Sequence, residues 1–409
     1  MKKNWKIFVA LWLMLVAFVL FYKGIRPGWN DTKTDFNNYY ASAKLIQKGE
    51  SIHAFYSNDR FKEMAQSVAV KNGAKFSPFP PPTAVLYWPL SFFDLLTAKR
   101  IWLVFNMLLL VWLPFRMKRY FRSSVWKNAL MLSLFVIPLS SNLHFGQFYF
   151  VTAFVLVEAI GHFRVTKKSM LSSVLIGVLA SVKYVPILFL GYLMRFSKES
   201  MKPIFTAIAT LLVITGIFVL IDFEAYGVYL RDLGGHVNGD LSGQGKYAIG
   251  FQSLDALFNN LFVADAVENP KPFFEAEWLK PVLKWMIVAV VGVACFLMLR
   301  KEKYAFSPST VSVGIIGAFV LIPASASYHF LLLILPIFFI LRWLVKERSV
   351  GHFLIAIALI FGAFSIQAYQ IPSVEQWPFA DLLIHFPRLW LIVALFSFLV
   401  YCKQSVKNS

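Results

Sequence analysis

A few ionisable side chains stand beside long hydrophobic stretches, and their types suit proton transfer and anion binding. Asp35 opens the segment 34–45, shortly after the first hydrophobic stretch of the chain. A carboxylate in that place can cap a helix, where its charge suits the helix dipole. It can also serve as a general base close to the bilayer surface and take a proton from a sugar hydroxyl. The residue alone leaves both interpretations open.

Three further polar residues come from separate parts of the chain. Lys183 stands between two short hydrophobic runs, where a lone cation is costly and usually functional. A lipid phosphate is its natural partner, and snorkelling to the membrane surface is the alternative. His329 can bind a phosphate or tune a base, or it is an interfacial histidine bonded to backbone. Gln147 follows Gly146 in a polar turn and is a candidate for phosphate or lipid binding.

The side chains near these residues are candidates for the wall of a substrate pocket. The segment 76–90 is rich in proline and aromatic residues, so it cannot be a continuous helix. Irregular backbone at membrane depth is buried in protein or lines a cavity. We therefore expect an elbow or one wall of a substrate groove there. The further pocket candidates are Tyr39, Tyr40, His53, Tyr56, His144 and Tyr328.

Composition places these residues in a membrane protein. Hydrophobic residues make up 58% of the 409 residues and charged residues only 15%, whereas a soluble domain carries about a quarter charged residues. The sequence therefore predicts an all-α, multi-pass membrane protein that uses the whole chain, 1–409, as one domain. We expect about a dozen membrane helices, at 6–22, 98–116, 127–141, 148–163, 170–182, 184–195, 203–222, 281–300, 309–323, 329–345, 351–369 and 387–402.

The segments between these runs differ in character. The pair 170–182 and 184–195 is short enough to be a hairpin that enters the membrane only partway. Two long hydrophilic segments are expected outside. The first, 23–97, contains an interfacial helix from about Asp35 to Lys48 and a re-entrant or interfacial stretch at 80–95. The second is 223–280. Glu158 is expected to hydrogen-bond between helices.

The charges predict the orientation. Short loops rich in Lys and Arg stay in the cytoplasm. Placing every basic loop inside alternates correctly with the hydrophobic runs, and these loops together carry the whole net charge of +19. Both termini are therefore expected in the cytoplasm, with Asp35, Gln147, Lys183 and His329 on the outer face. The basic excess indicates contact with anionic lipid and argues against nucleic-acid binding. No phosphate-binding glycine loop is present, so no nucleotide cofactor is expected.

The order of these residues resembles glycosyltransferase family 87, polytopic enzymes of the GT-C superfamily. The resemblance runs from about residue 1 to 345. It is carried by single residues in the right order and on the expected side of the membrane: Asp35, Tyr39, Gly49, Tyr56, Phe79-Pro80-Pro81, Trp88-Pro89-Leu90, Gly146-Gln147, Lys183, Pro186, Tyr328-His329 and Pro336.

The resemblance implies a GT-C-like bundle and an enzyme that uses a polyprenyl-phosphate sugar, typically mannose. Such enzymes transfer the sugar to a lipid or glycan acceptor outside the cytoplasmic membrane, with inversion. Asp35 matches the family's base, and His329 matches its later histidine. Lys183 matches the lysine of the short hairpin, which we expect to bind the donor phosphate. The segment 76–82 departs from the family's Phe-x-Tyr-x-Pro pattern. No second acid pairs with Asp35, so no metal is expected.

Two other classes of protein compete with this interpretation. A transporter or flippase of an envelope lipid or glycan precursor also has about a dozen helices, but it tends to place ionisable residues at the membrane midplane. Here the midplane is nearly free of charge, which favours an enzyme that acts at the outer surface. A structural partner in an envelope complex would not depend on Asp35. The sugar, the acceptor, the pathway and the oligomeric state are left open by the sequence.

Overall fold

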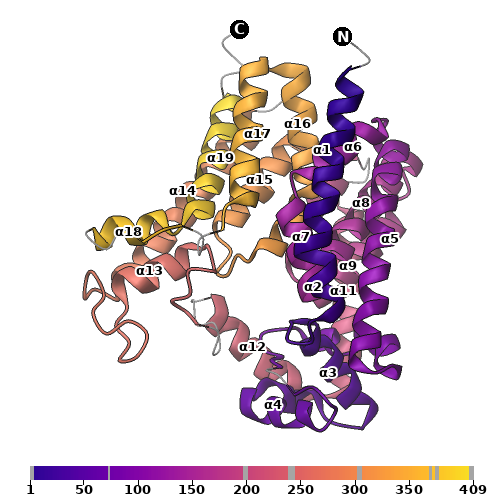
Figure 1. Cartoon of the computed structure of the whole chain (residues 1–409), viewed down its shortest axis with the longest axis vertical. Helices are drawn as coiled ribbons and strands as arrows, with labels where there is room; N and C mark the ends of the chain where they lie inside the picture. The colour runs from indigo at the N-terminus through magenta and orange to yellow at the C-terminus, as the bar shows by residue number, and fades with distance from the viewer. Residues whose placement is uncertain are drawn as a thin grey trace. The chain divides into compact units, whose positions relative to one another are not determined.

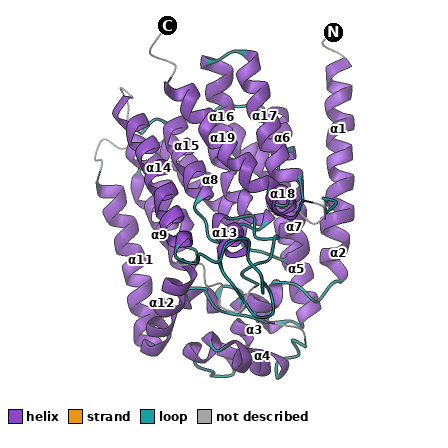
Figure 2. Ribbon diagram, turned by 90° about the vertical axis from the view of Figure 1, so that its left-hand side faces the viewer, coloured by secondary structure: helices purple, strands orange, loops and turns teal. Residues whose placement is uncertain are grey.

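The chain folds into helices joined by loops (Figures 1 and 2). The computed structural model describes residues 4–71, 74–196, 201–237, 245–301, 306–367, 371–373 and 377–404. Within these ranges the chain has α, 3-10 and π helices and no β-strand, apart from an isolated bridge between Asp265 and Asn269. Parts of three segments predicted to be cytoplasmic, at 197–200, 302–305 and 405–409, lie outside the described residues, as do residues 1–3.

Six helical segments are long and apolar enough to cross a membrane, and two bent helix pairs raise the number to eight. The protein is therefore polytopic, as predicted. The bent pairs are α6 (Val125–Ser133) with α7 (Val136–Phe145), and α18 (Pro378–Ile384) with α19 (Pro387–Gln404). The six are Lys6–Asn30, which includes α1 (Asn4–Leu20), η1 (Phe21–Ile25) and α2 (Arg26–Asn30), then α5 (Leu95–Phe121), α8 (Tyr149–Thr166), α11 (Lys202–Ile221), α14 (Leu279–Lys301), and η6 (Ser327–Leu333) with α16 (Ile334–Glu347).

Four shorter apolar segments account for the remaining predicted runs. They lie in α9 (Ser169–Val182), in η5 (Val185–Phe189) with α10 (Leu190–Phe196), in α15 (Pro308–Val320) and in α17 (Val350–Ser365). Every predicted run thus coincides with an apolar helix or a bent pair. Whether the four shorter segments cross the membrane, and which face is outside, stay predictions.

The chain divides into two units of dense internal contact, Met1–Gly234 and Gly235–Ser409. The use of the chain as one functional domain stays a prediction. The first unit also contains α3 (Phe36–Gln47), η2 (Ile52–Tyr56), α4 (Asn58–Gln66), η3 (Pro81–Val85), η4 (Trp88–Phe92) and most of α12 (Phe223–Val237). The second unit also contains α13 (Leu254–Phe262).

The segment 23–97 has an aromatic core of its own. Phe36, Phe55, Phe61 and Phe76 are fully buried there and pack together with residues of α12. The interfacial helix expected from about Asp35 to Lys48 is α3, which ends where Gly49 takes a positive φ of 84°. The proline-rich stretch forms the two short 3-10 helices η3 and η4 and no continuous helix, as expected because each proline lacks a backbone donor. Its depth in the membrane stays a prediction.

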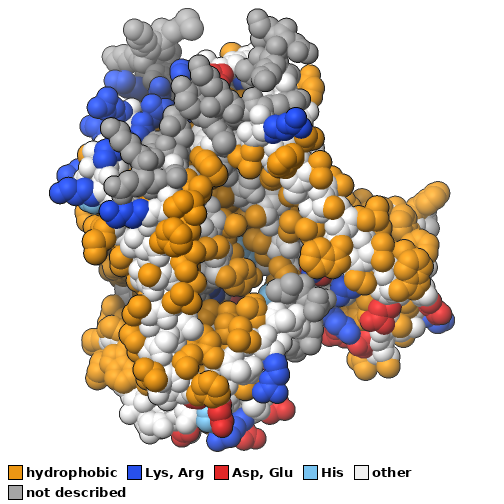
Figure 3. Space-filling view, turned by 180° about the vertical axis from the view of Figure 1, so that it is seen from behind, with side chains coloured by type: hydrophobic (Ala, Val, Ile, Leu, Met, Phe, Trp, Pro, Cys, Tyr) orange, Lys and Arg blue, Asp and Glu red, His pale blue; other side chains and the backbone are white. Residues whose placement is uncertain are grey.

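Charged side chains join two helices of the first unit and also mark its two ends. Glu158 in α8 accepts hydrogen bonds from Arg116 Nε at 2.6 Å and from the Tyr120 hydroxyl at 2.7 Å, both in α5. This confirms that Glu158 bonds between helices. Lys and Arg side chains gather at one end of the first unit, whereas the other end shows acidic and basic side chains together (Figure 3). Which end faces the cytoplasm stays a prediction.

Gly146 fixes the distance between α7 and α3. It ends α7 in the left-handed conformation, with φ of 66°, and a Cβ atom there would lie 2.8 Å from Cβ of Phe36. Both the backbone conformation and the space therefore require glycine. Gly146 also separates α7 from Gln147, and Phe36 directly follows Asp35. A side chain at Gly146 would push apart the two segments that carry these polar residues.

We predict that Gly146→Ala lowers the stability of the protein in detergent by about 1–3 kcal/mol, because alanine is strained at this φ and overlaps Phe36. The measurement is the midpoint of thermal unfolding. Gly216→Ala is the matched control, because Gly216 lies in α11 with no atom within 4 Å of its added Cβ. Equal midpoints for the two variants would contradict the close approach of α7 and α3.

Candidate functional site

Asp35 directly precedes α3, but its side chain does not cap the helix. Its backbone is helical, with φ of −62° and ψ of −17°, and its side chain makes no capping hydrogen bond. Its Oδ2 instead accepts a hydrogen bond of 2.6 Å from Nε2 of Gln147. A capping carboxylate turns toward the N–H groups of the first helical turn. The Asp35 carboxylate is therefore oriented by a different element, the turn between α7 and α8.

Gln147 lies between two functional groups of α3. Its Oε1 accepts a hydrogen bond of 2.8 Å from the hydroxyl of Tyr39, and its Nε2 donates to Asp35. Asp35 and Tyr39 are four residues apart, which places them on one side of a helix. Gln147 is only 3% exposed. The reversed amide would set its oxygen against the carboxylate, so the two bonds fix the orientation of the Gln147 side chain.

Several hydrogen bonds fix the turn that carries Gln147. The N–H of Gln147 donates to the carbonyl of Asn142 at 3.1 Å, and the Asn142 side chain accepts from the N–H of Phe150 at 3.1 Å. The hydroxyl of Tyr87 donates to the carbonyl of Gly146 at 3.2 Å. Because buried polar groups are costly when unpaired, these bonds hold the turn rigid. Gln147 is therefore preorganised for its two partners.

Lys183 is a buried cation at the end of α9. It is 8% exposed, and its Nζ donates to the Tyr39 hydroxyl at 3.3 Å. In the described part of the chain, Tyr39 supplies the hydrogen-bond acceptor that the ammonium contacts, although an ammonium carries three donors. Nζ lies 3.9 Å from the ring centroid of Phe79 and 5.0 Å from that of Tyr149. Such cation–π contacts offset part of the cost of burial.

Burial lowers the pKa of Lys183 from its ordinary 10.5 to about 7, and the negative charge of Asp35 opposes this decrease. Lys183 lies in the break between α9 and η5, outside both apolar helices. A lysine with a pKa near 7 gains strongly from an anion placed beside it, because the anion restores the favoured charged form. The electrostatics of the site therefore suit an anionic group.

The proline-rich segment forms one wall of the site. Phe79 stacks on Tyr39 with ring centroids 5.1 Å apart, and Tyr87 stacks on Tyr39 at 4.8 Å. Thr83 donates its hydroxyl proton to the carbonyl of Val182, the last residue of α9, at 3.1 Å. The segment thus fixes both the plane of the Tyr39 ring and the end of α9. The segment is therefore an elbow packed against Tyr39 and α9, and its role as the wall of a substrate groove stays a prediction.

Four of the residues predicted from the sequence therefore form one hydrogen-bonded chain. Lys183 donates to Tyr39, Tyr39 donates to Gln147, and Gln147 donates to Asp35. All three bonds run in the same direction, from the cation toward the carboxylate. Bonds aligned in this way polarise one another. The chain joins a cation suited to a phosphate with a carboxylate suited to proton transfer.

Sequence reasoning missed two charged residues beside this chain. Lys99 in α5 is 1% exposed, and its Nζ donates to the carbonyl of Asp31. The Asp31 carboxylate accepts from Nε2 of His144 at 3.0 Å. Partial burial raises the pKa of Asp31, but hydrogen bonds from Lys33 N–H and from His144 outweigh it and leave the pKa lowered. A lysine near the start of a membrane helix was the available signal for Lys99.

Other pocket candidates of the first unit form hydrogen bonds that join the segments around the site. Tyr40 donates to the carbonyl of Phe93 at 2.8 Å, and Tyr56 donates to the carbonyl of Phe79 at 2.6 Å. The backbone N–H of His53 donates to Asp222 at 2.9 Å, and its ring Nδ1 lies 3.2 Å from the same carboxylate. His53 therefore connects the first loop to the start of α12.

Tyr328 and His329 lie in the second unit. Nδ1 of His329 accepts a hydrogen bond of 3.0 Å from the N–H of Ala326, which places the proton of the neutral ring on Nε2. The ring of Tyr328 contacts that of His329 edge-on, with centroids 4.9 Å apart. Their convergence on Asp35 stays a prediction, because they belong to the other unit.

The residues described contain no group of three or more His, Cys, Asp or Glu side chains that could hold a metal ion. The groups in contact with the Asp35, Tyr39 and Lys183 side chains include amide, phenol, ammonium and aromatic groups. These are groups that orient a carboxylate and bind an anion by hydrogen bonds and charge.

Comparison with known protein families shows to which family the chain belongs. The family model of glycosyltransferase family 87 matches residues 78–323, well over half of the sequence. The match includes Gln147, Lys183 and the proline-rich segment from Pro78 onward, whereas Asp35 and His329 lie outside it. No curated protein and no solved structure matches the chain. On the strength of the family match and of the helical membrane fold, the chain belongs to glycosyltransferase family 87.

Proposed function

We propose that this membrane glycosyltransferase moves a sugar, mannose, from a polyprenyl-phosphate donor to a hydroxyl group of a lipid or glycan acceptor. The transfer takes place at the outer face of the cell membrane, with inversion and with Asp35 as the general base. The observation that carries this proposal is the orientation of Asp35, whose carboxylate is bonded to Gln147 and not to its own helix. Family membership supports the sugar transfer itself.

The reaction is a single displacement. Asp35 takes the proton of the acceptor hydroxyl while the acceptor oxygen attacks the anomeric carbon. The bond from that carbon to the phosphate oxygen breaks, and polyprenyl phosphate leaves. One carboxylate is sufficient, since a phosphate is a better leaving group than an alcohol and needs less help from an acid.

Lys183 stabilises the departing phosphate in this proposal. Its ammonium is buried and carries more donors than Tyr39 uses. Charge that develops on the phosphate oxygen is stabilised most by a fixed cation in a site that excludes water. The aromatic rings of Phe79 and Tyr149 hold the ammonium in place before the donor arrives.

Gln147 acts as a positioning residue. We expected it beside the phosphate, but its two hydrogen bonds support a role in orienting the base. By fixing Oδ2 of Asp35, the amide limits the rotation of the carboxylate and aims its second oxygen. For His329, in the second unit, the role predicted from the sequence is kept: it binds the phosphate or tunes the base.

Our first prediction on activity concerns the base. Asp35→Asn keeps the shape of the side chain but removes its basicity, so we expect sugar transfer to fall by at least a hundredfold. The measurement is transfer from radiolabelled polyprenyl-phosphate mannose in membranes with wild type or variant at matched expression. Asp59→Asn is a control on exposed α4.

Each result of that assay has a distinct meaning. Transfer by wild type that collapses in Asp35→Asn supports the reaction and the base. Equal transfer by both proteins keeps the reaction and rejects Asp35 as the base. If neither protein transfers mannose, the proposed sugar or acceptor is wrong or the transporter or flippase interpretation holds, and other polyprenyl-linked sugars are the next donors to test.

The second prediction concerns Lys183 and pH. Lys183→Met should raise the KM for the donor by about tenfold or more, because the phosphate loses a charged hydrogen bond. In wild type, donor affinity should fall as the pH rises above about 7, since the ammonium loses its proton there. Lys183→Arg stays charged and should bind the donor with little dependence on pH between 6 and 9. Unchanged donor kinetics in Lys183→Met would remove this residue from the phosphate site.

The third prediction separates positioning from binding. Gln147→Met keeps the length of the side chain but loses both hydrogen bonds, so kcat should fall about ten- to hundredfold. The KM for the donor should change less than threefold, because Lys183 is untouched. Gln66→Met, on the exposed side of α4, is the control. A large increase in donor KM with unchanged kcat would instead return Gln147 to the phosphate.

A further inference from the structure

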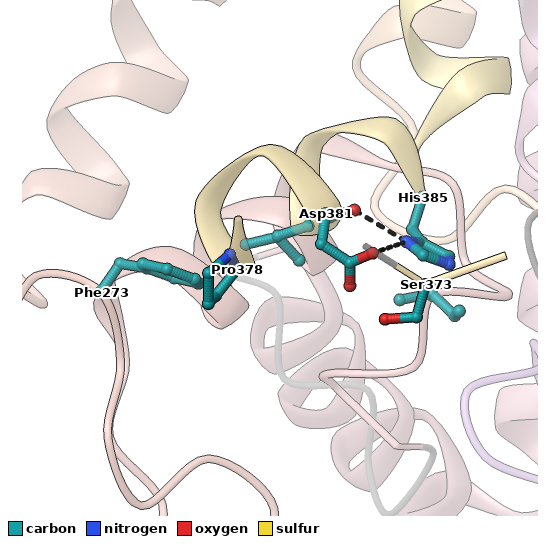
Figure 4. Close-up of a pocket in the computed structure, with 7 residues that line it drawn as sticks. Phe273, Ser373, Pro378, Asp381 and His385 are labelled. Atoms are coloured by element: carbon teal, nitrogen blue, oxygen red, sulfur yellow. Dashed lines mark hydrogen bonds and ion pairs between the residues drawn. The ribbon is translucent and has the colours of Figure 1, made fainter. Parts of the chain in front are cut away.

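The second unit contains a cavity that the proposed reaction does not use. Its volume is about 470 Å³, which falls within the usual range of small-molecule sites. Figure 4 shows that the lining comes from α18 and from loops that approach it from distant parts of the sequence. The lining residues are Ile249, Phe273, Ser373, Pro378, Asp381, Leu382 and His385.

One buried glutamine fastens the walls of this cavity. Gln252 is 4% exposed, and its Nε2 donates to the carbonyls of Ile249 at 2.5 Å and of His385 at 2.7 Å. Its Oε1 accepts from the N–H of Arg388 at 3.1 Å. The loop before α13 is thereby tied to the turn between α18 and α19. The shape of the cavity is consequently set by the fold.

The imidazole of His385 is fixed as well. Nδ1 lies 2.7 Å from the carbonyl of Asp381, and Nε2 lies 3.2 Å from the carbonyl of Ile371. The carboxylate of Asp381 is 3.6 Å from Nδ1 (Figure 4). Ser373 adds a hydroxyl to the lining. One part of the wall is therefore polar, and the rest is formed by apolar and aromatic side chains.

The side chains that line the cavity favour some classes of ligand over others. A carboxylate and a hydroxyl group form hydrogen bonds with sugar or polyol hydroxyls, and the Phe273 ring offers a flat apolar surface to a sugar face. The lining of described residues contains no Lys or Arg. A phosphate group would be repelled by the carboxylate of Asp381, and among the described lining side chains His385 alone can carry a positive charge. A neutral, hydroxyl-rich group fits better than an anionic one.

The surroundings of the cavity are those of a membrane surface. α18 meets α19 at an angle of 62°, and α14 begins at Leu279, directly after Trp278. Trp278 and Trp377 are each 68% exposed. Exposed aromatic side chains at the ends of membrane helices are typical of the lipid–water interface. Trp278 and Trp377 therefore suit a position of this part of the second unit at the lipid–water interface.

We propose that this cavity binds the neutral, hydroxyl-rich head group of a membrane lipid. Asp381 and Ser373 bind its hydroxyls, and Phe273 packs against its ring. The acyl or prenyl chains extend along the exposed apolar surface beside Trp377. The inference depends on the membrane placement of the second unit and not on sugar transfer, so it can fail or succeed independently of the proposed reaction.

The test is photo-crosslinking of the full-length protein in phosphatidylcholine nanodiscs. The probe is a monohexosyl diacylglycerol with a photoreactive group, and peptide mapping locates the label. We expect saturable labelling of peptides within 371–388. Asp381→Ala should raise the half-saturating mole fraction of probe about tenfold, because a charged hydrogen-bond acceptor is lost. Glu275→Ala, an exposed acid of the same unit outside the lining, should behave as wild type.

A second variant guards against misfolding as the cause. Leu382→Trp fills the cavity without removing a polar group, and it should abolish saturable labelling while the midpoint of thermal unfolding stays within a few degrees. Wild-type labelling in both variants would overturn the proposal. Competition by phosphatidylglycerol as strong as that of unlabelled probe would reject the neutral head group. Equal competition by a soluble methyl hexoside would assign the site to a free sugar.

Discussion

The hydrogen bond from Gln147 to Asp35 is the contact on which the geometry of the candidate site depends. It takes the carboxylate away from its own helix and joins α3 to the turn between α7 and α8. The second bond of Gln147 fixes Tyr39, and Tyr39 in turn positions the ammonium of Lys183. A carboxylate and a cation that come from distant parts of the sequence are thereby held in one arrangement. Their separation is set by side chains that undergo no chemistry themselves.

The backbone around this contact has little freedom. Gly146 allows α7 to end against Phe36 and so delivers Gln147 to α3. On the opposite side, the proline-rich segment stacks Phe79 and Tyr87 on Tyr39 and holds the end of α9 through Thr83. Proline restricts the chain before folding, so less entropy is lost when this wall forms. The rigid wall and the tight turn together preorganise the polar chain.

Sequence patterns were sufficient to predict the helical membrane architecture and part of the candidate site. Hydrophobic runs located the helices, since lipid demands long apolar segments, and the cost of burying a charge singled out Lys183. They could not reveal that Gln147 bonds to Asp35, because that bond joins positions 112 residues apart through a specific turn. Lys99 and Asp31 were missed for a related reason. From the sequence, Lys99, one turn into its helix, is interpreted as a lysine that reaches the membrane surface. Its contact with the Asp31 carbonyl is visible only once the neighbouring backbone is known.

The aromatic core that packs against α3 separates Asp35 from the lipid around the membrane helices. Phe36, Phe55, Phe61 and Phe76 are shielded from every solvent by their own segment and by α12. The packing of such a core depends on its side chains and not on acyl-chain length or headgroup type. The backbone of Asp35 is thus supported by protein side chains, whereas its partner Gln147 lies between α7 and α8, two elements of the candidate membrane spans. A change of bilayer thickness would therefore reach the Asp35 carboxylate through its hydrogen bond to Gln147 and not through α3.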